Sequence, residues 1–307
     1  MDKIAFIFPG QGVQKIGMGK DIYENYSCAR KIYDRVSEAT NMDIASLCFE
    51  ENDKINITEF TQVALLTTEL AILEVVCNVG LKPDVCAGLS IGEYSALVAT
   101  EAISIEDAAR LVKKRGNLMH NAMPEGNGTM SAILGLETDI VEGLCKNADG
   151  IVEVANYNSP VQTVISGEKH AVKSITDIIE EEYMAMVVEL NVSGAFHSSL
   201  LESAGEALSK EIKITKFADP KIAYVANLTA ELIFNKEQIG ELLVKQVSNP
   251  VLWQKSVKRM IDHGVNTFIE IGPGKTLAGF NKEIDRNVKT INLRNLEDIH
   301  RNLNRKE

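Results

Sequence analysis

The sequence predicts an α/β fold in which a large core domain with a parallel sheet carries a smaller inserted subdomain. Three observations support this prediction. Short apolar runs alternate with longer helical patterns near both ends of the chain, which favours a parallel sheet covered by helices. Between residues 128 and 191 the order of the elements changes. The chain has 307 residues, of which 45% are apolar and 24% charged, enough for one large domain or two smaller ones.

The first part of the chain alternates strands with helices. Residues 4–8 form an apolar run that ends at Pro9-Gly10-Gln11-Gly12, which predicts a first strand and a loop. A second short strand is predicted over residues 85–89. Ser104 should cap a helix, since Asp107 follows it at the capping-box position. Helical periodicity is found over three segments, residues 23–40, 62–79 and 104–123.

An inserted subdomain is predicted after Pro124-Glu125-Gly126-Asn127-Gly128, a segment typical of a hinge. The elements that follow are strand 129–136, helix 139–147, strands 151–157 and 162–166, helix 169–183 and strand 185–190. This β-α-β-β-α-β order is the ferredoxin-like arrangement. We therefore expect residues 128–191 to form the subdomain, and residues 1–127 and 192–307 to form the core domain. Strands near residues 222–225, 267–271 and 288–292 would complete the core sheet.

An insertion of this kind creates a cleft at the junction of the two domains, where ligands often bind. The helix that carries Arg115 leads into the insertion, and the loop that carries His197 follows it. Both side chains could therefore reach the cleft.

Charge and cysteine usage exclude several classes of function. The net charge of −11 disfavours nonspecific binding of nucleic acid. The cysteines are odd in number, widely spaced and without a CxxC motif, which disfavours a disulfide framework and a zinc site. They are Cys28, Cys48, Cys77, Cys86 and Cys145.

We expect no transmembrane span, because the apolar runs are short and broken by charge, and the first apolar run is too short for a signal peptide. The cytoplasm is the expected location.

The segment Gly88-Leu89-Ser90-Ile91-Gly92 holds the pattern Gly-x-Ser-x-Gly between a predicted strand and a predicted helix. Glycines at these positions allow a tight turn and close packing of helix on strand. The turn projects the hydroxyl of the serine clear of the backbone, and the helix N-terminus directs free N–H groups toward any oxyanion that develops there. The context favours Ser90 as a nucleophile, with the hydrolase-like arrangement of a strand, a sharp turn and a helix in the core domain.

A serine nucleophile needs a base, and the chain has five histidines. His197 lies in a loop of small residues, Ser193-Gly194-Ala195-Phe196-His197-Ser198, which would allow a substrate to approach closely. We expect His197 to be functional. The other histidines have ordinary surface settings: His120, His170, His263 and His300.

Other polar residues remain open on local sequence alone. The backbone N–H of Gln11 could face a site at the ends of the strands, or Gly10-Gln11-Gly12 could be an ordinary turn. Arg115 ends a basic run on a helix, where a surface position is the simpler interpretation. Gln246 follows a predicted helix over residues 237–244, in a loop that ends it, and residues 156–160, which begin with Asn156, are predicted to form a turn.

Taken together, these motifs resemble one family. Its motifs occur here in the same order, over essentially the whole chain: Phe8-Pro9-Gly10-Gln11-Gly12, Gly88-Leu89-Ser90-Ile91-Gly92-Glu93-Tyr94, Lys114-Arg115-Gly116, residues 156–160, Ala195-Phe196-His197-Ser198, residues 246–250 and residues 270–274. The sequence is similar to the malonyl-CoA:acyl carrier protein transacylases of fatty acid synthesis and to the acyltransferase domains of polyketide synthases. It departs from many members at Leu89, where they have histidine.

The resemblance implies a role for each matching residue. Ser90 would be the acylated nucleophile and His197 its base, with the backbone carbonyl of Gln246 orienting the imidazole. Arg115 would bind the free carboxylate of a malonyl group. The backbone N–H groups of Gln11 and Ile91 would form the oxyanion hole. Phe196 matches the malonyl-selective members, and the remaining substrate-binding position is Asn156.

The resemblance also implies an [acyl-carrier-protein] S-malonyltransferase with ping-pong kinetics and no cofactor or metal. Its partners would be malonyl-CoA and acyl carrier protein, with no nucleic acid or membrane, and we expect a monomer.

Three alternatives remain. One is a discrete acyltransferase that serves a polyketide synthase, and another is an inactive module that only binds carrier protein. The third is a patatin-like serine hydrolase with a Ser–Asp dyad, for which Asp149-Gly150 is the local candidate, inside the predicted insertion.

Overall fold

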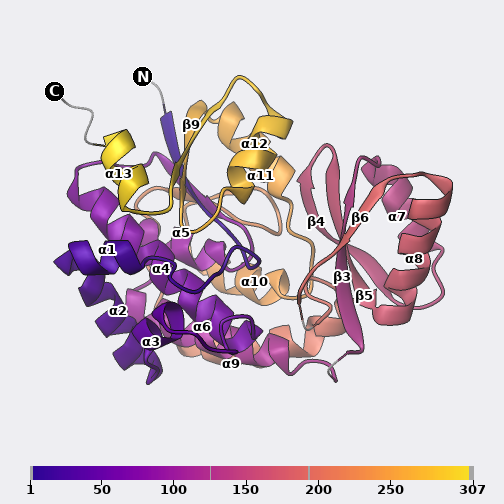
Figure 1. The fold of residues 1–307 in the computed structure, drawn as a ribbon, viewed down its shortest axis with the longest axis horizontal. Coiled ribbons are helices and arrows are strands. Elements are labelled where there is room, and N and C mark those ends of the chain that lie inside the picture. Colours follow the sequence, from indigo (N-terminus) through magenta and orange to yellow (C-terminus); the bar gives the residue numbers. More distant parts are fainter. Residues whose placement is uncertain (1–2, 125, 193, 304–307) are drawn as a thin grey trace.

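The computed structural model describes residues 3–124, 126–192 and 194–303. These residues form two sheets, each in its own lobe of the molecule (Figure 1). Glu125 of the predicted hinge and Ser193 of the loop before His197 lie outside the described residues. The predicted fold class is confirmed: one sheet is mainly parallel and covered by helices, and the other is antiparallel.

The larger sheet has six strands in the order β10-β9-β1-β2-β7-β8. The strands are β1 (Lys3–Phe8), β2 (Val85–Gly88), β7 (Ala223–Val225), β8 (Leu232–Ile233), β9 (Val265–Ile271) and β10 (Lys289–Leu293). Neighbours from β10 to β7 are parallel, and β8 is antiparallel to β7. Phe8 at the end of β1 is paired with Gly88 at the end of β2. The loops that follow these two strands therefore meet at one edge of the sheet.

The two faces of this sheet pack against different helices, because successive side chains of a strand point to opposite faces. Ala5 and Ile7 pack against α11 (Trp253–Asp262) and α12 (Thr276–Ile284). Phe6 and Phe8 belong to the larger core on the opposite face. Its helices are α1 (Lys20–Asn25), α2 (Ser27–Thr40), α3 (Ile44–Phe49), α4 (Thr58–Asn78), α5 (Gly92–Ala99), α6 (Ile105–His120), α9 (Glu202–Ile214), α10 (Lys236–Gln246) and α13 (Leu296–Leu303).

Helix α4 corrects one expectation from the sequence. Over the described residues, Thr58–Asn78 is long and apolar enough to pass as a membrane span by length and composition, although the apolar runs looked too short and too broken by charge. In the structure most of this helix is buried inside the protein. A helix that is apolar on all sides is typical of the centre of a large core, and α4 lies there among the other helices (Figure 1).

The smaller sheet has four antiparallel strands in the order β4-β5-β3-β6. Its elements are β3 (Gly128–Leu134), α7 (Thr138–Lys146), β4 (Val152–Ser159), β5 (Gln162–Glu168), α8 (Lys169–Glu182) and β6 (Met186–Glu189). The predicted β-α-β-β-α-β order is confirmed. Helices α7 and α8 share one apolar core with the sheet, built around Ile133, Val154 and Ile165. All of these elements lie between residues 128 and 189.

Two local predictions were wrong. The pattern over residues 23–40 predicted one helix, but the backbone at Tyr26 is extended and separates α1 from α2. The Asn, Ser and Pro residues at 156–160 predicted a turn, and the preceding strand was expected to end at 157, but β4 continues to Ser159. Pairing of Asn156 with Val164 of β5 and a β-bridge to Val251 outweigh the local turn preference.

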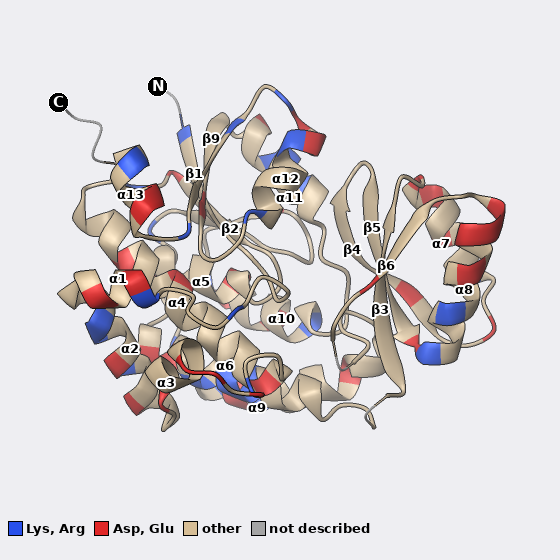
Figure 2. Cartoon of the chain, in the orientation of Figure 1, with Lys and Arg blue, Asp and Glu red and all other residues tan. Residues whose placement is uncertain are grey.

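Charged residues of both signs lie side by side on outer helices, for example α8 and α13 in Figure 2. Lys173 pairs with Asp177 on α8, and both Arg294 and Arg301 pair with Asp298 of α13. Positive charge at these places is offset by neighbouring carboxylates.

Candidate active site

Ser90 occupies a sharp turn between β2 and α5, as the Gly-x-Ser-x-Gly pattern predicted. Its φ angle is 55°, in the left-handed region that residues other than glycine rarely adopt. A Cβ atom at Gly88 would lie 1.9 Å from the carbonyl carbon of Gly92, and one at Gly92 would lie 2.3 Å from the carbonyl oxygen of Phe8. Glycine is therefore required at both positions for the helix to approach the strands this closely.

Asn227, which follows β7, holds this strained turn from the neighbouring strand. Its side-chain Oδ1 accepts a hydrogen bond from the backbone N–H of Ser90 at 2.6 Å, and its Nδ2 donates to the carbonyl of Gly88 at 2.6 Å. Sequence analysis missed Asn227, because no local motif marks a contact between residues so far apart in the chain. The clamp helps to maintain a backbone conformation that would otherwise be unfavourable.

His197 lies directly against the serine. Its Nε2 is 2.7 Å from Ser90 Oγ, and its Nδ1 is 2.7 Å from the carbonyl oxygen of Gln246. Gln246 is the last residue of α10, where carbonyls have no partner within the helix. Because a carbonyl can only accept, Nδ1 carries the proton and Nε2 is free to accept the proton of Ser90.

The environment of His197 keeps the imidazole neutral. The side chain is only 4% exposed. Burial lowers the pKa of His197 to about 4, and the nearby positive charge of Arg115 acts in the same direction. At neutral pH the ring is thus in the form that can act as a base.

Arg115 extends from α6 into the same site. The interpretation that it is an ordinary surface arginine is wrong, since it is only 1% exposed. Its Nη2 donates to Ser90 Oγ at 3.1 Å and to Gln246 Oε1 at 2.9 Å, and its Nη1 donates to Gln62 Oε1 at 2.7 Å. The guanidinium also lies over the ring of Tyr94, with its centre 5.7 Å from the ring centroid. The result is a buried cation within hydrogen-bonding distance of the serine hydroxyl.

The predicted oxyanion residues lie in the two loops that meet at the sheet edge. Gln11 follows β1, and its side chain donates to Thr58 Oγ1 at 3.2 Å. Ile91 is the N-cap residue of α5, and the first N–H groups of a helix have no acceptor within it. A Cβ atom at Gly10 would lie 2.6 Å from the side chain of Leu89, so the first loop lies against the Ser90 turn.

In the described structure, the side chains of Phe196 and Asn156 lie outside the hydrogen-bond network that joins Ser90, His197 and Arg115. Phe196 precedes His197 and is buried in the larger core. Asn156 lies on β4, where its β-bridge to Val251 joins the smaller sheet to the segment after α10. Neither side chain is hydrogen-bonded to Ser90, His197 or Arg115 in the described structure.

Glu93 is a further residue of the site to which sequence analysis assigned no role, although it lies within the serine motif. It is buried on α5, and its Oε2 accepts from Gln246 Nε2 at 2.7 Å and from the Asn227 N–H at 3.3 Å. Burial raises the pKa of Glu93 to about 7, against the opposing effects of Gln246, Asn227 and Arg115. Its place in the family's serine motif, directly after Gly92, was the sequence signal for it.

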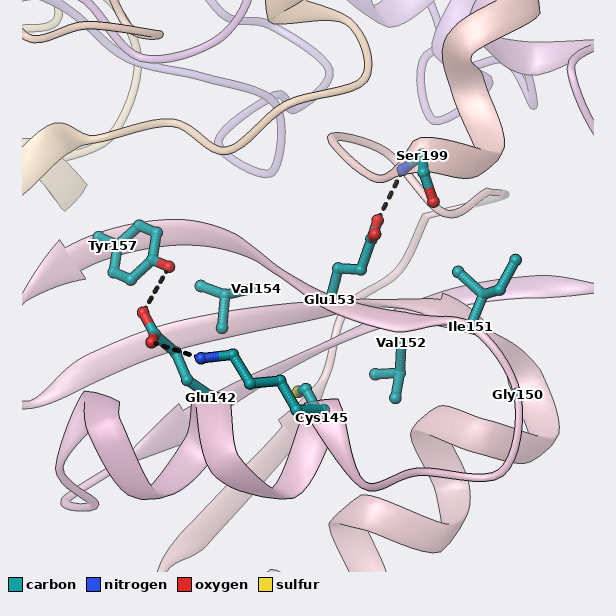
Figure 3. Close-up of a pocket in the computed structure, with 10 residues that line it drawn as sticks. Glu142, Cys145, Gly150, Ile151, Val152, Glu153, Val154, Tyr157 and Ser199 are labelled. Atoms are coloured by element: carbon teal, nitrogen blue, oxygen red, sulfur yellow. Dashed lines mark hydrogen bonds and ion pairs between the residues drawn. The ribbon is translucent and has the colours of Figure 1, made fainter.

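A cavity of about 510 Å³, lined by residues of α7 and β4 and by Ser199, is separate from this constellation. Figure 3 shows that both glutamates lining it are paired: Tyr157 donates to Glu142, and Glu153 accepts from the N–H of Ser199. Ser90, His197 and Arg115 do not line it. Within the described ranges, no group of three or more His, Cys, Asp or Glu residues could hold a metal ion.

Comparison with known proteins agrees with this geometry. Residues 5–298 match the family described as Acyl transferase domain. The malonyl CoA-acyl carrier protein transacylase of Bacillus subtilis is 40% identical over 303 residues, which cover 97% of this chain and 96% of the relative.

Two solved structures extend the comparison. The malonyl CoA-acyl carrier protein transacylase of Clostridium perfringens superimposes with a TM-score of 0.94 at 41% identity, over 98% of this chain and 96% of that one. A malonyl-transacylase solved in complex with a type II polyketide synthase acyl-carrier protein gives a TM-score of 0.95 at 34% identity, over 99% of both chains.

Proposed function

Since the chain belongs to the acyl transferase domain family, we propose that it transfers the malonyl group of malonyl-CoA to the phosphopantetheine thiol of an acyl carrier protein. The product would be malonyl-acyl carrier protein for fatty acid synthesis in the cytoplasm. The observation that carries the proposal is the buried Arg115 cation, whose Nη2 lies 3.1 Å from the serine oxygen.

The position of Arg115 suits a short diacid. In a malonyl ester of Ser90, only three bonds would separate Oγ from the carbon of the free carboxylate. A guanidinium within hydrogen-bonding distance of Oγ can therefore also reach that carboxylate. Arginine binds both carboxylate oxygens with its planar fork and stays charged at any working pH. A serine hydrolase acting on neutral esters would have no use for this buried charge.

The first half-reaction forms the acyl-enzyme. His197 Nε2 takes the proton of Ser90, and Oγ attacks the thioester carbonyl of malonyl-CoA. The N–H groups of Gln11 and Ile91 would stabilise the oxyanion, each by about 3 kcal/mol if they act as such donors do in other acyl-transfer sites. The C–S bond then breaks, and the imidazolium returns its proton to the departing sulfur of coenzyme A.

The second half-reaction runs in the opposite sense. The thiol of the carrier protein loses its proton to His197 and attacks the malonyl-serine ester. Collapse of the tetrahedral intermediate breaks the bond to Oγ, and the imidazolium protonates Ser90. One covalent intermediate shared by two substrates gives ping-pong kinetics.

A patatin-like hydrolase is less consistent with the histidine. His197 Nδ1 is bonded to the Gln246 carbonyl rather than to a carboxylate. Asp149, the candidate acid, lies in the connection between α7 and β4 of the smaller domain. An acyltransferase that serves a polyketide synthase stays a second candidate, because one closely superimposable structure holds such a carrier. The two differ in the carrier protein and share the chemistry.

Intact mass measured after sequential mixing tests the proposal. The protein mixed with malonyl-CoA should gain one malonyl group, and a phosphopantetheinylated fatty acid carrier protein added next should remove it and become malonylated. A polyketide carrier protein serves as the comparison. Loss of the adduct to water at the same rate with and without either carrier would identify a hydrolase instead.

Substitution of Arg115 tests the basis of selectivity. Arg115→Ala should remove roughly 2–5 kcal/mol of transition-state stabilisation from malonyl transfer, because the carboxylate of the malonyl group loses a buried charged partner. The rate of acetyl transfer should rise relative to that of malonyl transfer, since the variant has no buried cation that the neutral acetyl group would leave unpaired. Arg115→Lys should restore malonyl transfer only in part, because a point charge cannot reproduce the fork.

The quantity to measure is the malonyl-to-acetyl ratio of kcat/KM. An equal fall for both substrates in Arg115→Ala would show that Arg115 supports the structure and is not the carboxylate receptor.

A further inference from the structure

Gln246 connects the three principal groups of the site. Its side-chain Oε1 accepts from Arg115 Nη2 at 2.9 Å, and its Nε2 donates to the carbonyl of Ser90 at 2.9 Å. Its main-chain carbonyl accepts from His197 Nδ1 at 2.7 Å. The contact to the histidine depends on the backbone at the end of α10, whereas the contact to Arg115 depends on the orientation of the side-chain amide.

That amide has one acceptable orientation. If its oxygen and nitrogen exchanged places, two N–H donors would face each other at Arg115. The amide oxygen would then face the carbonyl of Ser90 and the ionised carboxylate of Glu93. Both of these groups only accept hydrogen bonds, so the amide oxygen would have no donor there. The Glu93 carboxylate accepts the shorter of the two Gln246 Nε2 hydrogen bonds, at 2.7 Å. It therefore directs the amide oxygen toward the guanidinium.

Glu93 lies behind the reacting atoms. It is only 1% exposed, and its hydrogen bonds go to Gln246 and to Asn227, which clamps the Ser90 turn. In the described structure its Oε1 has no hydrogen-bond partner. Burying a carboxylate with one oxygen unpaired costs free energy, so we expect the role of Glu93 to lie in the hydrogen bonds of its other oxygen, Oε2.

We propose that Glu93 is a positioning residue for acyl selectivity: it orients the Gln246 amide and thereby aims the Arg115 guanidinium at the carboxylate of the bound acyl group. This inference rests on the proposed malonyl transfer. Glu93 touches neither Ser90 Oγ nor His197 in the structure, so its loss should alter recognition of the acid end more than the acyl-transfer chemistry.

Three substitutions separate this role from simple support of the fold. Glu93→Ala removes the acceptor, and Glu93→Asp keeps the acid but withdraws it by one methylene. Glu93→Gln keeps an oxygen of the right reach, which can still accept from Gln246. We expect kcat/KM for malonyl-CoA to fall about 10- to 100-fold in Glu93→Ala, the range for loss of a hydrogen bond to a charged group. The value for acetyl-CoA should fall much less, so the malonyl-to-acetyl ratio drops.

Rescue by the conservative variant is the decisive readout. Glu93→Gln should recover most of the malonyl-to-acetyl ratio, and Glu93→Asp should be intermediate. Glu69→Ala is the matched control, because Glu69 is also buried and accepts from Ser95 of the same helix α5 at 2.5 Å. It should lower the thermal unfolding temperature while leaving the ratio unchanged.

The outcomes can be told apart from failure of the proposed function. If the wild-type protein transfers no malonyl group, the proposed function fails first. If the wild type transfers malonyl but Glu93→Ala lowers kcat/KM equally for malonyl-CoA and acetyl-CoA, the positioning role is wrong. It is also wrong if the malonyl-to-acetyl ratio of Glu93→Gln is as low as that of Glu93→Ala. Should Glu93→Ala not fold, the same comparison between Glu93→Asp and Glu93→Gln decides the question.

Discussion

Ser90→Ala should abolish the malonyl adduct and leave a folded protein. The substitution removes one oxygen atom, which accepts from Arg115 and lies 2.7 Å from His197 Nε2, and no other nucleophile is aligned with that base in the described structure. Transfer to the carrier protein should fall by on the order of 10⁶-fold, the scale seen when a serine nucleophile is removed from other acyl-transfer enzymes. Intact mass after mixing with malonyl-CoA checks the adduct directly.

The fold should survive this change because the turn is held by backbone contacts. Asn227 bonds to the N–H of Ser90 and the carbonyl of Gly88, and neither contact involves the serine side chain. Thermal unfolding of Ser90→Ala should therefore stay close to that of the wild type. A malonyl adduct at full stoichiometry on the variant would move the nucleophile to another residue.

The serine turn could be predicted from sequence because its determinants are local. Gly88 and Gly92 are needed where backbone atoms approach most closely, and both lie within two residues of Ser90. Long-range contacts left no such signal. Asn227 and Gln246 reach Ser90 from segments more than a hundred residues away, and only the family resemblance gave Gln246 a role in the site.

Tertiary pairing also explains the failed predictions. Residues 156–159 have turn composition, yet they complete an edge strand because β5 and the segment at Val251 supply hydrogen-bond partners on both sides. Arg115 looked like a surface residue because it ends a basic run, but its face of α6 turns toward the site. The roles of the individual site residues stay predictions until the variants are measured.

His197→Ala should slow both half-reactions by roughly 10²- to 10⁴-fold, the usual contribution of a positioned general base. In each step the same Nε2 atom takes a proton, first from Ser90 and then from the thiol of the carrier protein. The main-chain carbonyl of Gln246 holds Nδ1, so the correct tautomer exists before substrate binds. Rates of acylation and of transfer, measured separately by quenched flow and intact mass, should fall together, whereas His120→Ala should change neither.

The pH dependence of the wild type gives an independent check on the same residue. The imidazole acts as a base only when neutral, so activity must fall as pH drops through its pKa. Burial and the charge of Arg115 lower that pKa to about 4. The pKa of Glu93 is raised to about 7, but its neutral form keeps an oxygen that can accept from Gln246, as Glu93→Gln does. The kcat/KM for malonyl-CoA, which reports groups of the free enzyme, should therefore stay nearly level as pH falls from 7 toward 5 and decline only near pH 4. Glu93, with a pKa of about 7, could produce an acid limb of its own in the wild type. An acid limb near 6.5, the ordinary histidine value, that persists in Glu93→Gln would therefore mean that the base is a solvated group and not the buried His197.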